Sequence, residues 1–113
     1  MTVFILEDDA SVRDALSVFV EQMGHTVRLF SDAESFFAAG VPSGDDMVIV
    51  DIGLPGIDGT KVVSWVNALA DTPRVLAITG QSQTIIRDFL GGLPSTQLLR
   101  KPLSANQLAH HLQ

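Results

Sequence analysis

Five short, largely apolar segments alternate along the chain with longer stretches in which apolar residues recur every three or four positions. The short segments cover residues 3–6, 26–30, 47–50, 75–78 and 96–99. Such segments are typical of strands that are buried on both faces of a parallel sheet. Their alternation with helical patterns predicts a doubly wound α/β fold, in which helices cover both faces of one five-stranded sheet.

The first helix is predicted to begin at Asp9, a residue type that caps helix N-termini, and to stop at Gly24. On a 3.6-residue period its apolar residues fall on one side, and Arg13 falls on the side that we expect to face water. The apolar residues are Val12, Leu16, Phe19, Val20 and Met23. This pattern predicts an amphipathic helix that packs against the sheet.

The remaining helices have recognisable ends. A serine followed three residues later by Glu or Gln can form a capping box at a helix N-terminus. The chain contains two such pairs, Ser31 with Glu34 and Ser104 with Gln107. A further helix is predicted after Gly59, and another over residues 82–90.

Polar residues follow four of the predicted strands at their carboxyl ends. They are Glu7 and Asp8 after the first strand, Asp51 after the third, Thr79 after the fourth and Lys101 after the fifth. Ligands of open parallel α/β sheets bind beyond these ends, so we expect the five residues to share one site. Three neighbouring carboxylates repel one another, which favours an oxygen-preferring divalent cation such as Mg²⁺.

This combination of residues suits phosphoryl transfer. A carboxylate such as Asp51 can attack phosphorus and form an acyl phosphate, and the remaining requirements are positioning and charge neutralisation. Lys101 would supply a compact positive charge and Thr79 a hydroxyl group for the transferred oxygens.

Composition narrows the classes of function. A chain of 113 residues fits one domain, which we expect to span residues 1–113. The absence of cysteine excludes disulfides, thiolate catalysis and cysteine-based zinc sites. A net charge of −6 argues against direct nucleic-acid binding. Without an apolar segment of roughly 20 residues or a recognisable signal peptide, we expect a cytoplasmic location and no membrane partner.

Taken together, the residues closely resemble one family, the receiver domain of bacterial two-component response regulators. The resemblance covers essentially the whole chain. It rests on Glu7-Asp8, on the motif from Asp51 through Pro55 to Gly59, on Ile78-Thr79-Gly80 and on Arg100-Lys101-Pro102. It implies the flavodoxin-like receiver fold with strand order 2-1-3-4-5.

The resemblance also implies a metal site. Glu7 and Asp8 would be the acidic pair, completed by Asp51 and the backbone carbonyl of Gly53. The bound cation would be Mg²⁺, with Mn²⁺ able to take its place. Asp51 would be the phosphoacceptor.

The implied switch residues are Thr79 and Lys101, and Lys101 would precede a cis-proline, Pro102. Family members usually carry Tyr or Phe at the position of Leu98, and that ring turns inward when the threonine moves. Leu98 has no ring and no hydroxyl group, so it could respond only through its rotamer and packing.

The function implied is that of a signalling switch rather than a conventional enzyme. Asp51 would take a phosphoryl group from the phosphohistidine of a sensor histidine kinase or phosphotransfer protein, and would lose it by hydrolysis. Phosphorylation would alter the face of the fourth helix, fifth strand and last helix, which a partner or a second copy in a homodimer would bind. The domain could be the N-terminal part of a transcriptional regulator.

Three other functions share part of this pattern. A phosphorylation-independent pseudo-receiver would keep the fold without the chemistry, although the full residue set argues against it. A phosphatase of the haloacid dehalogenase type needs a second Asp where this chain has Gly53. A flavodoxin-like FMN binder needs a Ser/Thr/Gly-rich loop after the first strand, where Glu7 and Asp8 would repel the phosphate.

Two adjacent histidines, His110 and His111, lie near the end of the last predicted helix. Adjacent helix residues point about 100° apart, and no acidic residue lies one turn away. We therefore do not expect this pair to bind a metal.

Overall fold

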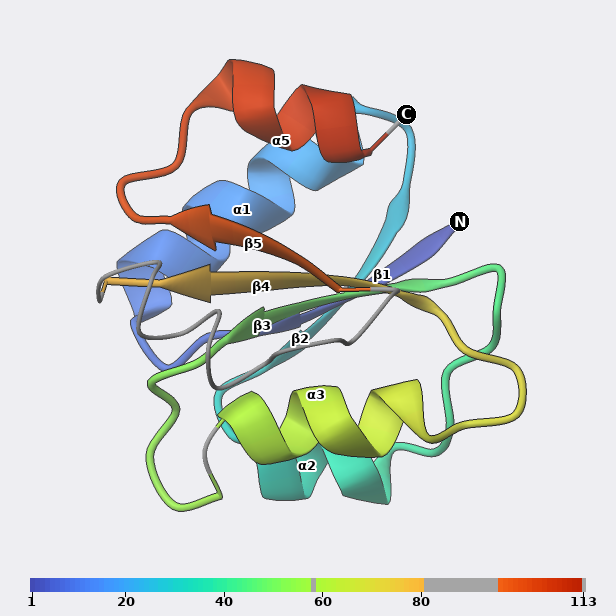
Figure 1. The fold of residues 1–113 in the computed structure, drawn as a ribbon. Helices are drawn as coiled ribbons and strands as arrows, with labels where there is room; N and C mark the ends of the chain where they lie inside the picture. Colours follow the sequence, from blue (N-terminus) through green and yellow to red (C-terminus); the bar gives the residue numbers. More distant parts are fainter. Residues whose placement is uncertain (58, 81–95, 113) are drawn as a thin grey trace.

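The computed structural model describes residues 1–57, 59–80 and 96–112. Its strands form one parallel sheet in the order β2-β1-β3-β4-β5, with helices on both faces (Figure 1). The strands are β1 (Thr2–Leu6), β2 (Thr26–Phe30), β3 (Met47–Asp51), β4 (Arg74–Thr79) and β5 (Thr96–Arg100). The described helices are α1 (Ala10–Gln22), α2 (Ala33–Ala38), α3 (Gly59–Asn67) and α5 (Ala105–His111). The predicted doubly wound fold and its strand order are confirmed.

Four of the five strands are longer than the apolar segments that predicted them. The added positions are Thr2, Asp51, Arg74, Thr79 and Arg100. Polar residues can extend a strand because the ladder is made by backbone groups, which every residue except proline supplies in full. Asp51 pairs with Ile78 of β4, so the acidic residue is the last residue of β3 and not part of the following loop.

Two apolar clusters fill the space between the sheet and its helices. α1 and α5 lie on one face of the sheet, and α2 and α3 lie on the other (Figure 1). Ile5 belongs to the cluster with Leu16 of α1, whereas Phe4 belongs to the cluster with Phe36 of α2. Successive strand residues point to opposite faces, so the buried strand β1 contributes to both clusters and is held on both sides.

α1 begins as the sequence predicts. The Asp9 side chain accepts hydrogen bonds from the backbone N–H groups of Ser11 and Val12 at 2.9 and 3.3 Å. Gly24 follows the helix with a φ of +90°, a conformation that favours glycine. The prediction that Met23 faces the core is wrong: it is the C-cap residue and 36% of it is exposed.

α2 begins one residue later than the sequence predicts. Asp32, and not Ser31, is the N-cap residue, and its Oδ1 accepts a hydrogen bond of 2.7 Å from the backbone N–H of Ser35. The predicted capping box at Ser31 is therefore wrong. Ala33 and Phe36, three positions apart, are both fully buried against the sheet, and this packing determines where the helix starts.

The capping box predicted for α5 is confirmed. The backbone N–H of Gln107 donates to Ser104 Oγ at 3.1 Å, and the backbone N–H of Ser104 donates to Gln107 Oε1 at 3.2 Å. Leu108 then joins the apolar cluster beneath α1, and Leu103 packs against the same cluster.

Two further observations concern the helices. The helix predicted over residues 82–90 lies outside the described residues. Of the helices that the structure describes, none combines the length and hydropathy needed to cross a bilayer, and the longest, α1, has 13 residues.

Candidate functional site

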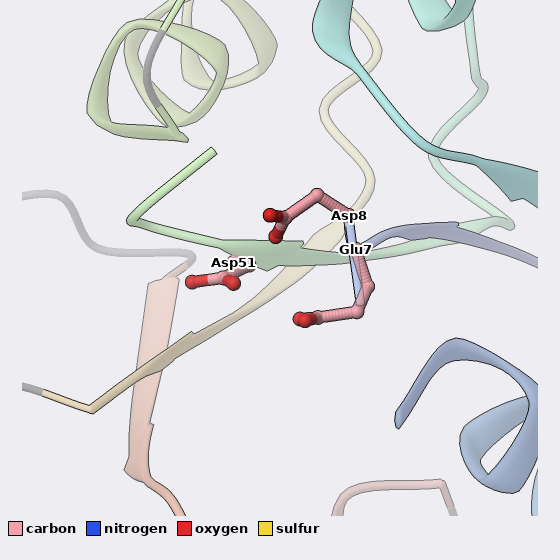
Figure 2. A group of neighbouring side chains, drawn as sticks. All are labelled: Glu7, Asp8 and Asp51. Atoms are coloured by element: carbon pink, nitrogen blue, oxygen red, sulfur yellow. The ribbon is translucent and has the colours of Figure 1, made fainter. Parts of the chain in front are cut away.

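Three carboxylates gather at the carboxyl edge of the sheet. β1 and β3 are neighbours, and Leu6 pairs with Val50, so the residues that follow each of them, Glu7 and Asp51, lie level with one another. One carboxylate oxygen from each of Glu7, Asp8 and Asp51 lies within 4.8 Å of the others. Figure 2 shows these side chains at the ends of the two strands. The predicted gathering of acidic residues is therefore present.

The carboxylates differ in their exposure to solvent. Glu7 is fully buried and Asp51 is 7% exposed, whereas Asp8 is exposed. Glu7 Oε2 is buried and has no hydrogen-bond partner among the described residues. An unsatisfied carboxylate oxygen inside an acidic cluster is what an oxygen-coordinated divalent cation requires. The donor set therefore fits Mg²⁺ or Mn²⁺.

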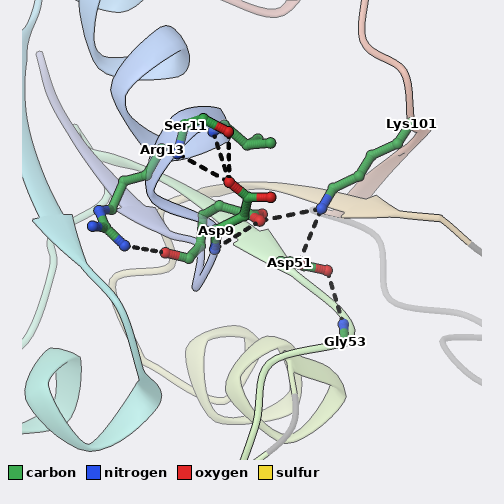
Figure 3. Close-up of polar contacts among 8 residues, drawn as sticks. Asp9, Ser11, Arg13, Asp51, Gly53 and Lys101 are labelled. Carbon is green, nitrogen blue, oxygen red and sulfur yellow. Dashed lines mark hydrogen bonds and ion pairs between the residues drawn. The ribbon is translucent and has the colours of Figure 1, made fainter.

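Lys101 links two of the carboxylates. Its Nζ lies 3.2 Å from Glu7 Oε1 and 3.1 Å from Asp51 Oδ2. In Figure 3 the lysine side chain reaches across from the end of β5 toward Asp51. A single ammonium group faces three carboxyl groups, so it cannot balance the charge of the cluster by itself, which favours the binding of a cation.

Burial and charge change the proton affinities of this cluster. Desolvation by burial, followed by the negative charge of Asp51, raises the pKa of Glu7 from 4.5 to about 7. Burial acts to lower the pKa of Lys101, but the hydrogen bonds and charges of Asp51 and Glu7 outweigh it and raise that pKa. Lys101 therefore stays protonated at neutral pH.

The backbone after β5 positions Lys101. Its backbone N–H donates to the Thr79 carbonyl at 2.7 Å, which ties the end of β5 to the end of β4. The Lys101–Pro102 peptide bond is cis. The lysine ammonium group lies over the carboxyl edge of the sheet, in contact with Glu7 and Asp51.

The loop after Asp51 folds closely around its backbone. The Gly53 N–H donates to Asp51 Oδ1 at 2.9 Å, so both carboxylate oxygens have a hydrogen-bond partner. At Gly59 a Cβ atom would overlap the Asp51 carbonyl oxygen and lie 2.6 Å from Ile52 Cα. The start of α3 can approach the end of β3 only because position 59 has no side chain. This contact gives a physical reason for glycine in the motif that runs from Asp51 to Gly59.

The other predicted site residues lie on β4 and β5. Thr79 ends β4 beside the acidic edge and is 2% exposed. Leu98 pairs with Ala77, is half-buried and packs against the cluster on the α2 and α3 face. Leu98 therefore lies beside the site without belonging to the acidic cluster, and its role stays a prediction.

Sequence reasoning missed the role of Arg13. We expected this residue to face water, but it is half-buried and its Nη1 donates to the Glu7 backbone carbonyl at 2.9 Å (Figure 3). A carbonyl just beyond a strand end has lost its ladder partner and needs another donor. The position of Arg13 on the first turns of α1 was the available signal, but the sequence does not define how this helix crosses β1.

Comparison with known proteins identifies related sequences. A family model described as response regulator receiver domain matches residues 3–113. The chain is 27% identical over 106 residues to the transcriptional regulatory protein FixJ of Bradyrhizobium diazoefficiens, covering 94% of this chain and 52% of that protein. It is 31% identical over 107 residues to the sensory transduction protein RegX3 of Mycolicibacterium smegmatis, covering 95% of this chain and 46% of that protein. The chain spans about half the length of the curated relatives it matches.

Solved structures resemble the fold closely. The BeF3-activated DrrB receiver domain matches with a TM-score of 0.86 and 17% identity, covering 98% of this chain and 92% of that one. The chemotaxis protein CheY4 of Vibrio cholerae gives a TM-score of 0.86 and 22% identity, covering 99% and 95%. At such identities these two matches concern the fold alone. Full-length FixJ from B. japonicum matches with a TM-score of 0.80 and 26% identity, covering 98% of this chain and 55% of that one.

Proposed function

Because the chain belongs to the response regulator receiver domain family, we propose that it is a phosphorylation-dependent switch in which Asp51 accepts a phosphoryl group. The observation that carries the proposal is the contact between Asp51 and Lys101 at 3.1 Å, beside a buried Glu7 with one unsatisfied oxygen. A carboxylate suited to nucleophilic attack, a lysine ammonium group and a candidate cation site thus lie together at the carboxyl edge of the sheet, which supports the proposal.

The proposed reaction needs little from the protein beyond positioning. An Asp51 oxygen forms a bond to phosphorus while the phosphorus–nitrogen bond of a kinase phosphohistidine breaks, and the imidazole nitrogen keeps the electron pair. The Gly53 N–H, 2.9 Å from Oδ1, orients the carboxylate. Lys101, 3.1 Å from Oδ2, is placed to transfer its contact to a phosphoryl oxygen.

The acidic cluster would hold the metal ion. Glu7, Asp8 and Asp51, with the backbone carbonyl of Gly53, are the proposed ligands for Mg²⁺, and Mn²⁺ suits the same oxygens. When bound, the cation supplies positive charge that neutralises the phosphoryl oxygens. Glu7 would offer a buried carboxylate oxygen, Oε2, that has no hydrogen-bond partner among the described residues.

The new dianion would alter the surface beside the site. We propose that it attracts Thr79 and Lys101 and biases the face formed by β5, α5 and the segment over residues 82–90, of which the last lies outside the described residues. Leu98, which lies on β5 and packs against the apolar cluster on the α2 and α3 side, would respond by a rotamer change. A partner protein or a second copy of the chain would bind the altered face.

The proposed partners follow from the family. A sensor histidine kinase or phosphotransfer protein would donate the phosphoryl group. The relative FixJ is named a transcriptional regulatory protein, and a regulatory output of that kind is proposed here too. With a net charge of −6, the chain itself is not proposed to bind DNA.

Native mass spectrometry tests the proposal directly. The chain is incubated with a small acyl phosphate donor, with and without Mg²⁺, alongside Asp51→Asn. We expect one Mg²⁺-dependent phosphoryl adduct that is absent from Asp51→Asn and retained by Asp14→Asn, a matched change at an exposed acid on α1. An adduct on Asp51→Asn would place the chemistry elsewhere, and no adduct on any form would indicate a pseudo-receiver.

A further inference from the structure

The peptide group that joins Glu7 to Asp8 is bound by an arginine of the following helix. Arg13 Nη1 donates a hydrogen bond of 2.9 Å to the Glu7 carbonyl oxygen (Figure 3). Because a peptide group is planar, a donor fixed to its oxygen restricts rotation of the whole unit, and so restricts the backbone on both sides of it. Glu7 and Asp8 are two of the three residues of the acidic cluster. Arg13 therefore acts on the backbone that connects two proposed metal ligands.

Glu7 is held by contacts that Asp8 lacks. The Glu7 backbone N–H donates to the Phe30 carbonyl of β2 at 3.0 Å, and Glu7 Oε1 lies 3.2 Å from Lys101 Nζ. Asp8 is exposed, and within the described part of the chain its carboxylate has neither a hydrogen-bond partner nor an ion-pair partner. The direction of the Asp8 side chain toward the cluster therefore depends on the backbone between residues 7 and 8, which Arg13 holds.

The start of α1 fixes the backbone of Arg13. Its N–H donates to the Asp9 carbonyl at 2.9 Å, in the first turn of the helix. Leu16, three residues further on, is buried in the apolar cluster between α1 and the sheet. Arg13 itself is half-buried, and its guanidinium group forms no ion pair with a carboxylate of the described residues. The helix therefore anchors the base of this side chain, and its guanidinium group binds a neutral carbonyl and not an acid.

The charge of Arg13 works against the binding of a metal ion. A positive side chain near an acidic cluster offsets part of the negative charge and repels a second cation. Any contribution of Arg13 to metal binding therefore comes from the orientation that its hydrogen bond imposes and not from its charge. The two effects have opposite signs: removal of the charge alone would tighten metal binding, whereas loss of the orientation would weaken it.

We propose that Arg13 is a positioning residue of the acidic cluster. By holding the peptide group between Glu7 and Asp8, it keeps the Asp8 carboxylate directed toward the same divalent cation as Glu7. Neighbours that orient metal ligands without touching the metal commonly contribute to its affinity. The inference rests on the metal site of the proposed function, and it adds a residue that acts through the ligands it connects.

The metal affinity of the unphosphorylated chain tests this role. Mn²⁺ is the probe, because electron paramagnetic resonance measures the free ion and so gives the bound fraction without any phosphoryl transfer. Arg13→Met keeps an unbranched stem and removes the donors and the charge. We expect its dissociation constant for Mn²⁺ to be about tenfold weaker than that of the unchanged chain. Tighter binding by Arg13→Met, or an unchanged dissociation constant, would overturn the proposal.

Two further changes at the same position separate the hydrogen bond from the charge. Arg13→Lys restores a charge and a donor, and we expect it to recover part of the affinity that Arg13→Met loses. Arg13→Gln removes the charge in a milder way, and we expect it to weaken binding in the same direction as Arg13→Met. Circular dichroism checks the fold of each variant, and Arg13→Gln takes the place of Arg13→Met if the latter does not fold.

A double-mutant cycle with Asp8→Ala tests whether Arg13 acts through Asp8. Asp8→Ala removes the ligand whose direction the arginine is proposed to set. In that background Arg13→Met should change the dissociation constant for Mn²⁺ by less than about twofold, because no carboxylate is left at position 8 to be oriented. A loss as large as in the single variant would overturn the proposal, since the effect would then be independent of Asp8.

Arg28→Met is the matched control for a general loss of stability. The guanidinium carbon of Arg28 lies 5.5 and 5.7 Å from the ring centroids of Phe4 and Phe30. Both arginine variants should lower the melting temperature in EDTA, but only Arg13→Met should weaken Mn²⁺ binding. Equal weakening in the two variants would overturn the proposal in favour of a general loss of stability. No binding by the unchanged chain would overturn the proposed metal site as well, whereas binding that Arg13→Met leaves unaffected would overturn this inference alone.

Discussion

The carboxyl group of Glu7 is buried beside a second carboxylate, which raises its pKa to about 7. Ionisation of such a buried carboxyl group costs free energy, and this cost is avoided when the group is protonated and offset when it binds a cation. Lys101, at 3.2 Å, offsets only part of the cost because it is shared with Asp51. In the metal-free protein, ionisation of Glu7 therefore destabilises the folded state.

This cost makes stability depend on pH in the metal-free protein. The folded-state pKa of Glu7 lies above its ordinary value of 4.5, so its contribution to stability is fully present below about pH 4.5 and is lost as pH rises through about 7. We expect the free energy of unfolding in EDTA to fall by at most about 3 kcal/mol over this window, relative to Glu7→Gln. Urea titrations at several pH values measure the free energy of unfolding of both proteins. Subtracting one free energy from the other removes the contribution of the histidines, which both proteins share. Parallel curves would contradict the assignment.

Gly53 lies next to the carboxylate that is proposed to carry the phosphoryl group. A Cβ atom there would lie 3.6 Å from Asp51 Oδ1, an ordinary contact, so the position accepts a side chain. We expect Gly53→Asn to slow hydrolysis of the acyl phosphate on the order of threefold, or about 0.7 kcal/mol in the barrier, because the amide obstructs the water. Decay of the phosphorylated mass over time measures the rate. Gly53→Ala adds the Cβ atom without the amide group and so distinguishes their effects on the hydrolysis rate. Equal rates in all three proteins would contradict this prediction.

For single residues, the sequence is sufficient to predict which side chains lie close together when their positions depend only on the end of a strand. Glu7 and Asp51 could be predicted to meet because each follows an apolar strand, and parallel strands end at one edge. Arg13 could not be predicted to contact the Glu7 carbonyl, because that requires the crossing of α1 over β1. His25, whose Nε2 lies 3.1 Å from the Leu112 carbonyl, depends in the same way on contacts between distant segments.

Among the elements, helix starts were harder to predict than strands. The apolar segments gave the strands to within one residue at each end, because burial on both faces leaves little choice of register. At α2 both Ser31 and Asp32 are able caps, and local sequence does not choose between them. The choice is made by the sheet, which buries Ala33 and Phe36.

The two candidate caps of α2 can be compared directly. Asp32→Ala removes the acceptor of the 2.7 Å hydrogen bond from the Ser35 N–H, and we expect it to lower the melting temperature by about 4 °C. Ser31→Ala removes a side chain that does not cap the helix and should change the melting temperature little. Thermal unfolding followed by circular dichroism measures both. A larger effect for Ser31→Ala would return the helix start to its predicted position.

For the whole molecule, filling the acidic cluster should stabilise the fold. A ligand that binds only the folded state adds RT ln(1 + [L]/Kd) to the unfolding free energy, about 1.4 kcal/mol when Mg²⁺ is at ten times its Kd. We expect a rise in melting temperature of about 5 °C, measured by calorimetry with and without EDTA. Asp8→Asn should reduce the rise because it removes one of the three clustered carboxylates. The exposed Asp14→Asn should leave it intact, and an equal loss in both would indicate nonspecific screening.

The contacts of Arg74 with both Met1 and His111 bring the two ends of the chain together, on the side away from Asp51 (Figure 1). For protein engineering this is a convenient arrangement. A fluorophore or a surface tether attached at either end lies away from the acidic cluster, so a labelled domain can be used to follow the proposed phosphorylation of Asp51. The same closeness allows a short peptide to join the ends and new termini to be opened at Asp45, an exposed residue in the loop before β3, which would yield a circularly permuted domain.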